Sequence, residues 1–277
     1  MDIAKQRAKA DAFRRMHHGS NLLLLPNAWD VASARVFEEA GFGAIATTSA
    51  GIAFTLGYPD GQRISREEML AVVARIAAAV KVPVTADVES GYGNRPEDAA
   101  ETARSVIAAG AVGMNLEDAA HQGGRSLLDL SLQLERIAAV REAVRACGIS
   151  MVLNARTDVC LLEIGAPESR FDAALHRLAA FRDAGADCLF VPGLRDPETI
   201  RRLTSQLRHP VNILAGPGFP TIPELEKLGV ARVSLGSGPM RATLGLLQRM
   251  ALELKTEGTY QALQGGPSHA EMNKMLG

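Results

Sequence analysis

A short phrase recurs along the chain: a helical pattern ends in Ala-Gly or a close variant, and an apolar run follows at once. The phrase reads EEAGFGAIATTS, IAAGAVGMNLED, RDAGADCLFVPG and EKLGVARVSLGS. Glycine at that point suits the end of a helix, where the backbone takes up a left-handed conformation. The apolar runs are short, do not alternate strictly and are rich in Val, Ile and Ala. That composition is typical of parallel strands that are buried on both faces.

Eight apolar runs predict strands, and helical patterns separate most of them. The strands are expected at Leu22–Pro26, Ala44–Thr48, Val82–Asp87, Val112–Glu117, Met151–Arg156, Cys188–Pro192, Val211–Ala215 and Arg232–Gly236. Helices are expected at Ser65–Val80, Pro96–Ala109, Ser131–Cys147 and Pro167–Ala184. Eight strand–helix units in about 250 residues favour an α/β fold of the closed (β/α)8 TIM-barrel type. A doubly wound open sheet is the alternative, but no GxGxxG motif follows an early strand and no P-loop pattern is present.

The domain organisation follows from the same pattern. A chain of 277 residues with 47% hydrophobic content suits one large domain or two small ones. No linker or low-complexity segment divides it, so we expect residues 1–277 to form a single barrel domain. Beyond the eighth strand, about residues 240–277 form a helical extension whose apolar side chains need a partner on the same barrel or on another subunit. These side chains are Leu244, Leu246, Leu247, Met250, Leu252 and Leu254.

Composition argues against several classes of partner. The formal net charge is -1, from 30 basic and 31 acidic residues, so no charge excess favours nucleic acid or a membrane surface. The chain has only three cysteines, Cys147, Cys160 and Cys188, and no CxxC spacing, which makes a disulfide framework or a zinc site unexpected. The N-terminus lacks the apolar core of a signal peptide, and no apolar run reaches about 18 residues. We therefore expect a cytoplasmic protein.

Polar residues gather where the predicted strands end, which is the catalytic edge of a (β/α)8 barrel. They are Ser49, Ala50 and Gly51 after the second strand, Asp87 and Glu89 after the third, Glu117 and Asp118 at the end of the fourth, Arg156 and Asp158 at the end of the fifth, Asn212 on the seventh and Ser234 on the eighth. Asp87 and Glu89 are two residues apart, so in an extended strand they would share a face.

Converging carboxylates of this kind suit Mg²⁺ or Mn²⁺. Arg156 could hold a substrate carboxylate in a bidentate fork, and the N–H groups of Ser49–Gly51 could receive an oxyanion. A structural alternative stays open, because acids at strand ends also cap helices and form ion pairs, and Asp158 could simply pair with Arg156. From the residues alone, the prediction is a metal-assisted enzyme that acts on an anionic substrate.

Six motifs within residues 20–245 carry a resemblance to a known family. They are PNAWDVASARVFEEAGFGAIATTSAGIA, LGYPDG, TADVESGYG, NLEDA, NARTD and RVSLGSGPMRA. Together they resemble the isocitrate lyase/phosphoenolpyruvate mutase superfamily, on its shorter methylisocitrate lyase-like branch. The resemblance implies a TIM barrel, a Mg²⁺ site, 2-oxo acid or related carboxylate substrates and chemistry through an enolate. It also implies a homo-oligomer, a dimer or a tetramer, whose paired subunits exchange their last barrel helix.

The resemblance assigns roles to individual residues. Asp87 matches the direct metal ligand, and Glu89 and Glu117 match acids that hold the metal through its waters. Asp60, in LGYPDG, matches a mobile acid at the edge of the site, and Arg156 matches the substrate-binding arginine. The remaining substrate-binding positions are Ser49, Ala50, Gly51, Asn212 and Ser234.

One departure from the family pattern concerns the proton donor. Lyases of this group carry a cysteine in a Lys-Cys-Gly-His loop after the fourth strand, but here that region reads NLEDAAHQGGRSLLDLS and has no cysteine. His121 could supply the proton instead, although a solvated loop histidine is the alternative. Gln122–Gly124 would leave this segment flexible enough to act as a lid.

These features predict a Mg²⁺-dependent lyase that cleaves a C–C bond of a small 2-oxo or 2-hydroxy (di)carboxylate. Oxaloacetate-like decarboxylation is the favoured reaction, because a departing CO2 needs no dedicated acid and the missing cysteine would not matter. Two alternatives remain: C–P chemistry of the phosphonopyruvate hydrolase or mutase kind, and a 2-oxo acid-binding protein without catalysis.

Overall fold

A computed structural model of the protein describes residues 2–120 and 125–277. Its main sheet is entirely parallel and runs in the order β1-β11-β10-β9-β8-β5-β4-β3-β2. The strands are β1 (Leu23–Leu25), β2 (Asn27–Ala28), β3 (Ile45–Thr47), β4 (Val84–Ala86), β5 (Gly113–Glu117), β8 (Val152–Arg156), β9 (Cys188–Phe190), β10 (Val211–Leu214) and β11 (Arg232–Ser234). Each predicted strand contains one of these segments, so the predicted strand positions are confirmed.

The barrel closes at Pro26, the last residue of the first predicted strand, which separates β1 from the unpredicted strand β2. Leu25 in β1 lies opposite Ser234 in β11, whereas Ala28 in β2 lies opposite Thr47 in β3. Proline has no N–H to give to the ladder, which explains the interruption. Its carbonyl still accepts a hydrogen bond from the Ala46 N–H at 3.0 Å. Residues 23–28 therefore join both ends of the sheet, and the predicted (β/α)8 barrel is confirmed.

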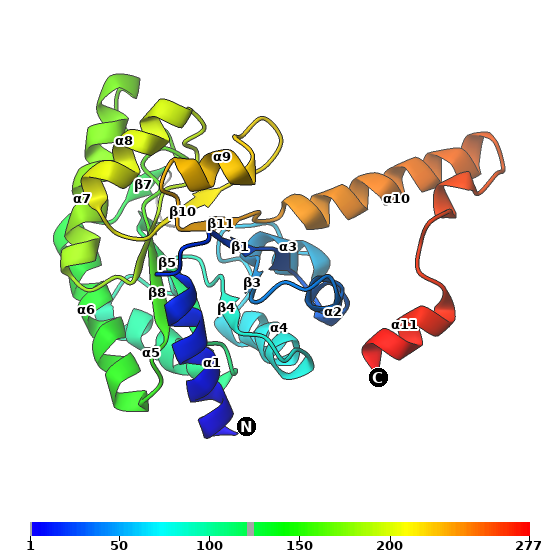
Figure 1. Cartoon of the computed structure of the whole chain (residues 1–277), viewed down its shortest axis with the longest axis horizontal. Coiled ribbons are helices and arrows are strands. Elements are labelled where there is room, and N and C mark those ends of the chain that lie inside the picture. The colour runs from blue at the N-terminus through cyan, green and yellow to red at the C-terminus, as the bar shows by residue number, and fades with distance from the viewer. Residues whose placement is uncertain (1, 121–124) are drawn as a thin grey trace.

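Helices surround the barrel, as Figure 1 shows. They are α2 (Val31–Glu39), α3 (Ser49–Thr55), α4 (Arg66–Ala79), α5 (Pro96–Ala108), α6 (Leu130–Cys147), α7 (Arg170–Asp183), α8 (Pro197–Leu207) and α9 (Ile222–Lys227). Helix α4 begins with a reciprocal cap in which Ser65 and Glu68 satisfy each other's backbone N–H. The helix predicted at Pro167–Ala184 is divided, because a 3₁₀ turn at Pro167–Ser169 precedes α7. A short antiparallel pair, β6 (Ala119–Ala120) and β7 (Ser126–Leu127), follows β5.

Helix α1 (Ile3–Met16) packs against the N-terminal end of the barrel. Its Phe13 is fully buried, and the Gln6 amide donates to the carbonyl oxygens of Ile107 at 2.8 Å and Ala111 at 3.2 Å. Gly113, the first residue of β5, makes this close approach possible. A Cβ atom there would lie only 2.8 Å from Phe13 Cε1 and 2.6 Å from Thr85 Oγ1.

The C-terminal extension leaves the barrel. Helix α10 (Gly238–Thr256) projects away from it, and α11 (His269–Leu276) follows at the end of the chain (Figure 1). Arg35 Nε donates to the Met275 carbonyl at 2.9 Å, which ties α11 to α2. Within α10 only Met240 is buried, and its leucines are exposed. They are Leu244, Leu246, Leu247, Leu252 and Leu254.

Two expectations from composition can be compared with the structure. The three cysteines are free, so no disulfide framework is present. Within residues 2–120 and 125–277, no helix combines the length and the apolar character needed to cross a bilayer.

The contact between α1 and Gly113 gives a test of the barrel's packing. Gly113→Ala should lower the free energy of unfolding by about 1–3 kcal/mol, because the added methyl group must displace Phe13 or Thr85. Chemical denaturation would measure the change. Gly216→Ala is the matched control, since a Cβ at Gly216 meets nothing within 4 Å. Equal stability of the two variants would contradict the packing argument.

Candidate active site

A cavity of about 640 Å³ opens at the C-terminal ends of the barrel strands. Most of the predicted site residues meet there, although they come from segments far apart in the chain. Those that line the cavity are Ser49, Ala50, Asp60, Asp87, Glu89, Glu117, Arg156 and Ser234. Gly51 and Asn212 are not among the lining residues, and His121 and Gln122–Gly124 lie outside the described part of the chain.

Asp87 directly follows β4, and both of its carboxylate oxygens accept hydrogen bonds. Its Oδ2 accepts hydrogen bonds from the Ser49 N–H at 2.9 Å and the Ser49 hydroxyl at 2.8 Å. Its Oδ1 accepts one from Asn115 Nδ2 at 3.1 Å, and its own N–H donates to Thr47 Oγ1 at 2.9 Å. The carboxylate direction is therefore fixed before any ligand binds.

Glu89 reaches the same cavity by a different route from the one predicted. Its φ is 53°, so it lies in a left-handed turn, and the extended-strand reason given for its position beside Asp87 is wrong. Oε2 accepts a hydrogen bond from the Gln62 N–H at 2.6 Å, whereas Oε1 is buried and has no partner in the described residues. Burial, followed by the nearby charges of Asp60 and Asp87, raises the pKa of Glu89 to about 8.

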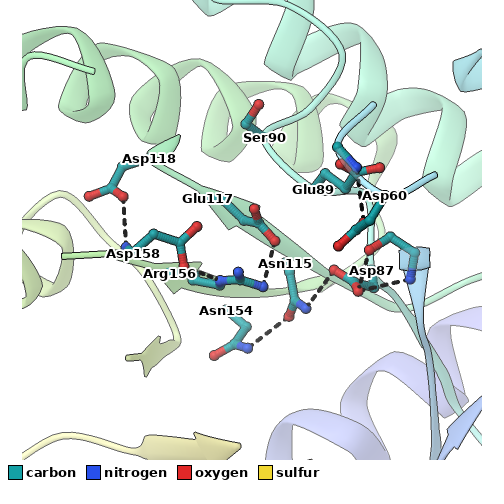
Figure 2. Close-up of polar contacts among 12 residues, drawn as sticks. Asp60, Asp87, Glu89, Ser90, Asn115, Glu117, Asp118, Asn154, Arg156 and Asp158 are labelled. Atoms are coloured by element: carbon teal, nitrogen blue, oxygen red, sulfur yellow. Dashed lines mark hydrogen bonds and ion pairs between the residues drawn. The ribbon is translucent and has the colours of Figure 1, made fainter. Parts of the chain in front are cut away.

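Glu117, Arg156 and Asp158 form a buried ion-pair group (Figure 2). Glu117 and Arg156 lie opposite each other in the β5–β8 register. Arg156 Nη1 lies 2.6 Å from Glu117 Oε1, and Arg156 Nε lies 2.7 Å from Asp158 Oδ1. Burial raises the pKa of Glu117 well above its ordinary value, although Arg156 opposes the shift. Burial also disfavours the charged guanidinium, but Asp158 and Glu117 outweigh this and raise the pKa of Arg156.

Arg156 is thus a permanent cation whose donors are partly used. Three of its five N–H groups are on Nη1 and Nε, the two atoms that contact Glu117 and Asp158. The two N–H groups of Nη2 take part in neither of these ion pairs. The Phe190 ring lies 5.4 Å from the guanidinium carbon and supports it from one side.

Other predicted residues have structural partners. Asp118 is fully buried; it pairs with Arg177 at 2.7 Å and accepts a hydrogen bond from the Asp158 N–H at 2.9 Å. Asn212 donates to Ser234 Oγ at 3.1 Å. The Gly51 N–H donates to Thr48 Oγ1 at 3.2 Å, which caps α3. The N–H groups of Ser49 and Gly51 already have acceptors, so these two could join the predicted oxyanion site only if their bonds opened.

The residues at the cavity fit a divalent cation. Within the described residues, no three Asp, Glu, His or Cys side chains lie close enough to share one ion. Mg²⁺ does not require that, because it keeps several waters and takes one or two carboxylates. The lining has five acids (Asp60, Asp87, Glu89, Glu117 and Asp158) against three arginines (Arg63, Arg125 and Arg156). The unpartnered Glu89 Oε1 and this acidic excess are what a bound cation would compensate.

The sequence analysis missed several residues at the cavity, namely Asn27, Arg63, Asn115, Arg125 and Phe190. Asn115 could have been found, because it lies two residues before Glu117 on the same strand and so faces the same side. The two arginines lie on loops, where no periodic pattern indicates their direction.

The fold and the cavity together define a (β/α)8-barrel protein with an acidic site at the C-terminal edge, the usual place for catalysis in this fold. Residues 13–255 match the family model described as phosphoenolpyruvate phosphomutase. The chain belongs to this family, within the isocitrate lyase/PEP mutase superfamily of lyases and mutases.

Individual relatives agree with this assignment. An uncharacterized protein of Mycobacterium tuberculosis (strain CDC 1551) is 37% identical over 233 residues, 84% of each chain. A 2-methylisocitrate lyase of Bacillus subtilis is 28% identical, over 92% of this chain and 85% of the relative.

Among solved structures, a Burkholderia cenocepacia J2315 protein provisionally assigned as a lyase/mutase has a TM-score of 0.92 and 39% identity, over 98% of this chain and 96% of the other. Oxaloacetate acetylhydrolase in complex with the product oxalate has a TM-score of 0.86 and 26% identity, over 97% and 94% of the two chains. Both likenesses span almost the whole chain, so the similarity is not confined to the barrel motifs.

The raised pKa of Glu89 predicts how stability depends on pH. Between its ordinary pKa of 4.5 and its folded pKa of about 8, the folded protein retains a proton that the unfolded chain has lost. The free energy of unfolding should therefore fall as pH rises across this range, by at most about 5 kcal/mol. Glu89→Gln should flatten this slope in metal-free denaturation curves. Glu97→Gln, an exposed acid on α5, is the control; an unchanged slope in Glu89→Gln would refute the assignment.

Proposed function

We propose that the protein is a Mg²⁺-dependent lyase that cleaves a C–C bond of a small 2-oxo dicarboxylate, with oxaloacetate-like decarboxylation as the leading reaction. The observation that carries the proposal is the charge balance of the cavity. Five acids face three arginines in the described lining, a formal excess of two negative charges. The metal-free protein offsets this excess with protons, because burial raises the pKa of both Glu89 and Glu117. One divalent cation would replace those protons, cancel the formal excess and let an anionic substrate approach the ionised acids. Mn²⁺ could take the place of Mg²⁺.

The residues that would hold the cation follow from the geometry above. Asp87 is the direct ligand, because its carboxylate is oriented by Ser49 and Asn115. Glu89 and Glu117 would act through waters on the cation. When bound, the cation stabilises the negative charge that develops on the 2-oxo oxygen of the substrate.

The arginines would bind the substrate's carboxylates. Arg156 keeps its charge in the buried ion-pair group and offers its Nη2 donors to the carboxylate beside the 2-oxo group. Arg63 and Arg125 line the same cavity and supply two further cations for a second carboxylate. This arrangement favours a dicarboxylate over a monocarboxylate.

Apolar side chains line the part of the cavity beyond β8, and this wall suits the departing group. Phe190 on β9 and Leu214 on β10 line the cavity on the far side of β8 from β4 and β5, together with Leu161 and Leu162. In oxaloacetate the departing carboxylate is the second one, assigned above to Arg63 and Arg125. Where it also meets these apolar side chains it loses solvation, whereas CO2 is uncharged, so this wall favours bond cleavage. The carbon–carbon bond breaks to give CO2 and the enolate of a 2-oxo acid, and water can then protonate the enolate carbon.

Turnover assays on the purified protein test the proposal. With Mg²⁺ and oxaloacetate, we expect release of CO2 and pyruvate, and Asp87→Ala should lower kcat by about 10²–10³-fold or more. Asp11→Ala, an exposed acid on α1, should behave like the unchanged protein. A panel of other 2-oxo and 2-hydroxy acids would define the substrate range.

Two outcomes would overturn the proposal. Phosphate release from phosphonopyruvate, without turnover of carboxylate substrates, would assign C–P chemistry. Ligand binding with Mg²⁺ but no turnover of any panel member would assign a binding protein, in which Asp87→Ala lowers only affinity.

We also propose that α10 packs against a second copy of the chain, as the sequence resemblance implies. Leu247 and Leu254 lie two turns apart on one side of α10 and are 55% and 52% exposed. A projecting helix with such a surface is expected to bury it in an oligomer. The exchange of this helix between paired barrels would produce a dimer, and two dimers would produce a tetramer.

Sedimentation measures the predicted oligomer. The unchanged chain should sediment as a dimer or tetramer, and Leu247→Glu/Leu254→Glu should shift it towards the monomer. Lys255→Glu places the same charge on an exposed position of the same helix and should leave the oligomer intact. A monomeric unchanged chain would contradict the proposal.

A further inference from the structure

Two asparagines, Asn115 in the cavity lining and Asn154 buried behind it, form a directed hydrogen-bond chain that ends on Asp87. Asn115 on β5 and Asn154 on β8 lie directly opposite each other in the parallel register, one step below Glu117 and Arg156. Asn154 Nδ2 donates to Asn115 Oδ1 at 2.8 Å, and Asn115 Nδ2 donates to Asp87 Oδ1 at 3.1 Å. Figure 2 shows the three side chains in this order.

The chemistry of the end group fixes the direction of the chain. An ionised carboxylate only accepts hydrogen bonds, so Asn115 must present its NH2 group to Asp87. Its carbonyl oxygen therefore faces Asn154, which must present an NH2 group in turn. Asn154 reinforces this orientation, because its hydrogen bond to the Asn115 oxygen opposes any rotation that would turn that oxygen towards Asp87, where the two acceptors would repel each other.

Counting acceptor sites shows what the chain does to Asp87. A carboxylate offers about four lone-pair directions. Asn115 occupies one, and the Ser49 N–H and hydroxyl occupy two more. One direction is left for a cation. Asp87 is thus prepared to bind through a single lone pair, in a position that its neighbours define.

We propose that Asn154 is a positioning residue for the metal site, acting on Asp87 through Asn115. Asn154 is 0% exposed and is not among the residues that line the cavity. It touches neither cation nor substrate, and its effect is transmitted by the orientation of one amide. The inference rests on the proposed function, because it assigns to Asp87 the role of metal ligand. Partners of a metal ligand typically contribute about 10–100-fold to metal affinity.

The test compares variants of the whole protein by Mg²⁺ titration calorimetry. Asn154→Leu should bind Mg²⁺ at least about tenfold more weakly than the unchanged protein. Gln6→Leu is the matched control, since it removes another buried amide, at the opposite end of the barrel. It should lower stability but leave the Mg²⁺ affinity unchanged.

A double variant separates positioning from stability. In Asn115→Leu/Asn154→Leu both partners of the buried hydrogen bond become apolar, so neither amide is left unsatisfied, although Asp87 also loses its Asn115 donor. The double variant should bind Mg²⁺ at least about tenfold more weakly than the unchanged protein. Because Asn154 acts through Asn115, it should bind no more weakly than Asn115→Leu alone, and a further loss would contradict that route. This comparison decides the question if Asn154→Leu alone does not fold.

A second readout needs no metal. The Ser49 N–H donates to Asp87 Oδ2, so a loosened Asp87 should expose it to solvent. In metal-free protein, its hydrogen exchange should be about tenfold faster in the single or double variant than in Gln6→Leu.

The outcomes distinguish the two proposals. Equal Mg²⁺ affinity in the unchanged protein and the variants overturns the positioning role and leaves the metal site standing. If the unchanged protein binds no Mg²⁺, the proposed metal site fails, and Ser49 exchange then decides the positioning role: faster exchange supports it and unchanged exchange overturns it.

Discussion

The ion pair between Glu117 and Arg156 is the interaction on which the site depends. It spans two neighbouring parallel strands whose register sets the two residues opposite each other. A lone buried carboxylate or guanidinium would be costly, and each partner reduces that cost for the other. Because Asp158 also contacts the guanidinium, at Nε, Arg156 stays charged in a largely buried place. A fixed positive charge beside the acids would let one cavity attract both the proposed cation and an anionic substrate.

The β5–β8 register also sets the pair of side chains next to Glu117 and Arg156 along the two strands. Side chains two residues apart on a strand point to the same face, so Asn115 and Asn154 repeat the pairing of Glu117 and Arg156 one level deeper in the barrel. Glu117 and Arg156 face the cavity, and the asparagine pair supports them. The barrel interior is therefore polar near its open end, whereas at the opposite end Phe13 packs near Gly113 and beside the buried guanidinium of Arg232. This division separates the part of the fold that does chemistry from the part that provides stability.

The sequence predicted the barrel well because its signals are local. Short apolar runs and helix-ending glycines mark the strands without knowledge of their partners, and the convergence of strand ends brought Asp87, Glu117 and Arg156 together as expected. It could not predict the left-handed turn that places Glu89, because the conformation of one non-glycine residue is set by its contacts. The hydrogen bond from the Ser49 N–H to Asp87 is likewise a long-range contact, and no sequence pattern predicts it.

The break at Pro26 has a consequence for how the chain acquires its fold. Leu23 in β1 pairs with Arg232 in β11, so the ring cannot close until almost the whole chain is available. Closing a loop of that length is entropically costly, and such distant pairings tend to form late. During synthesis, the edge of β1 that pairs with β11 would remain unpaired until β11 leaves the ribosome. Unpaired strand edges promote association with other chains. Pro26 faces Ala46 in β3 and not this edge, so what limits the unpaired edge as a template is its length of three residues, Leu23–Leu25.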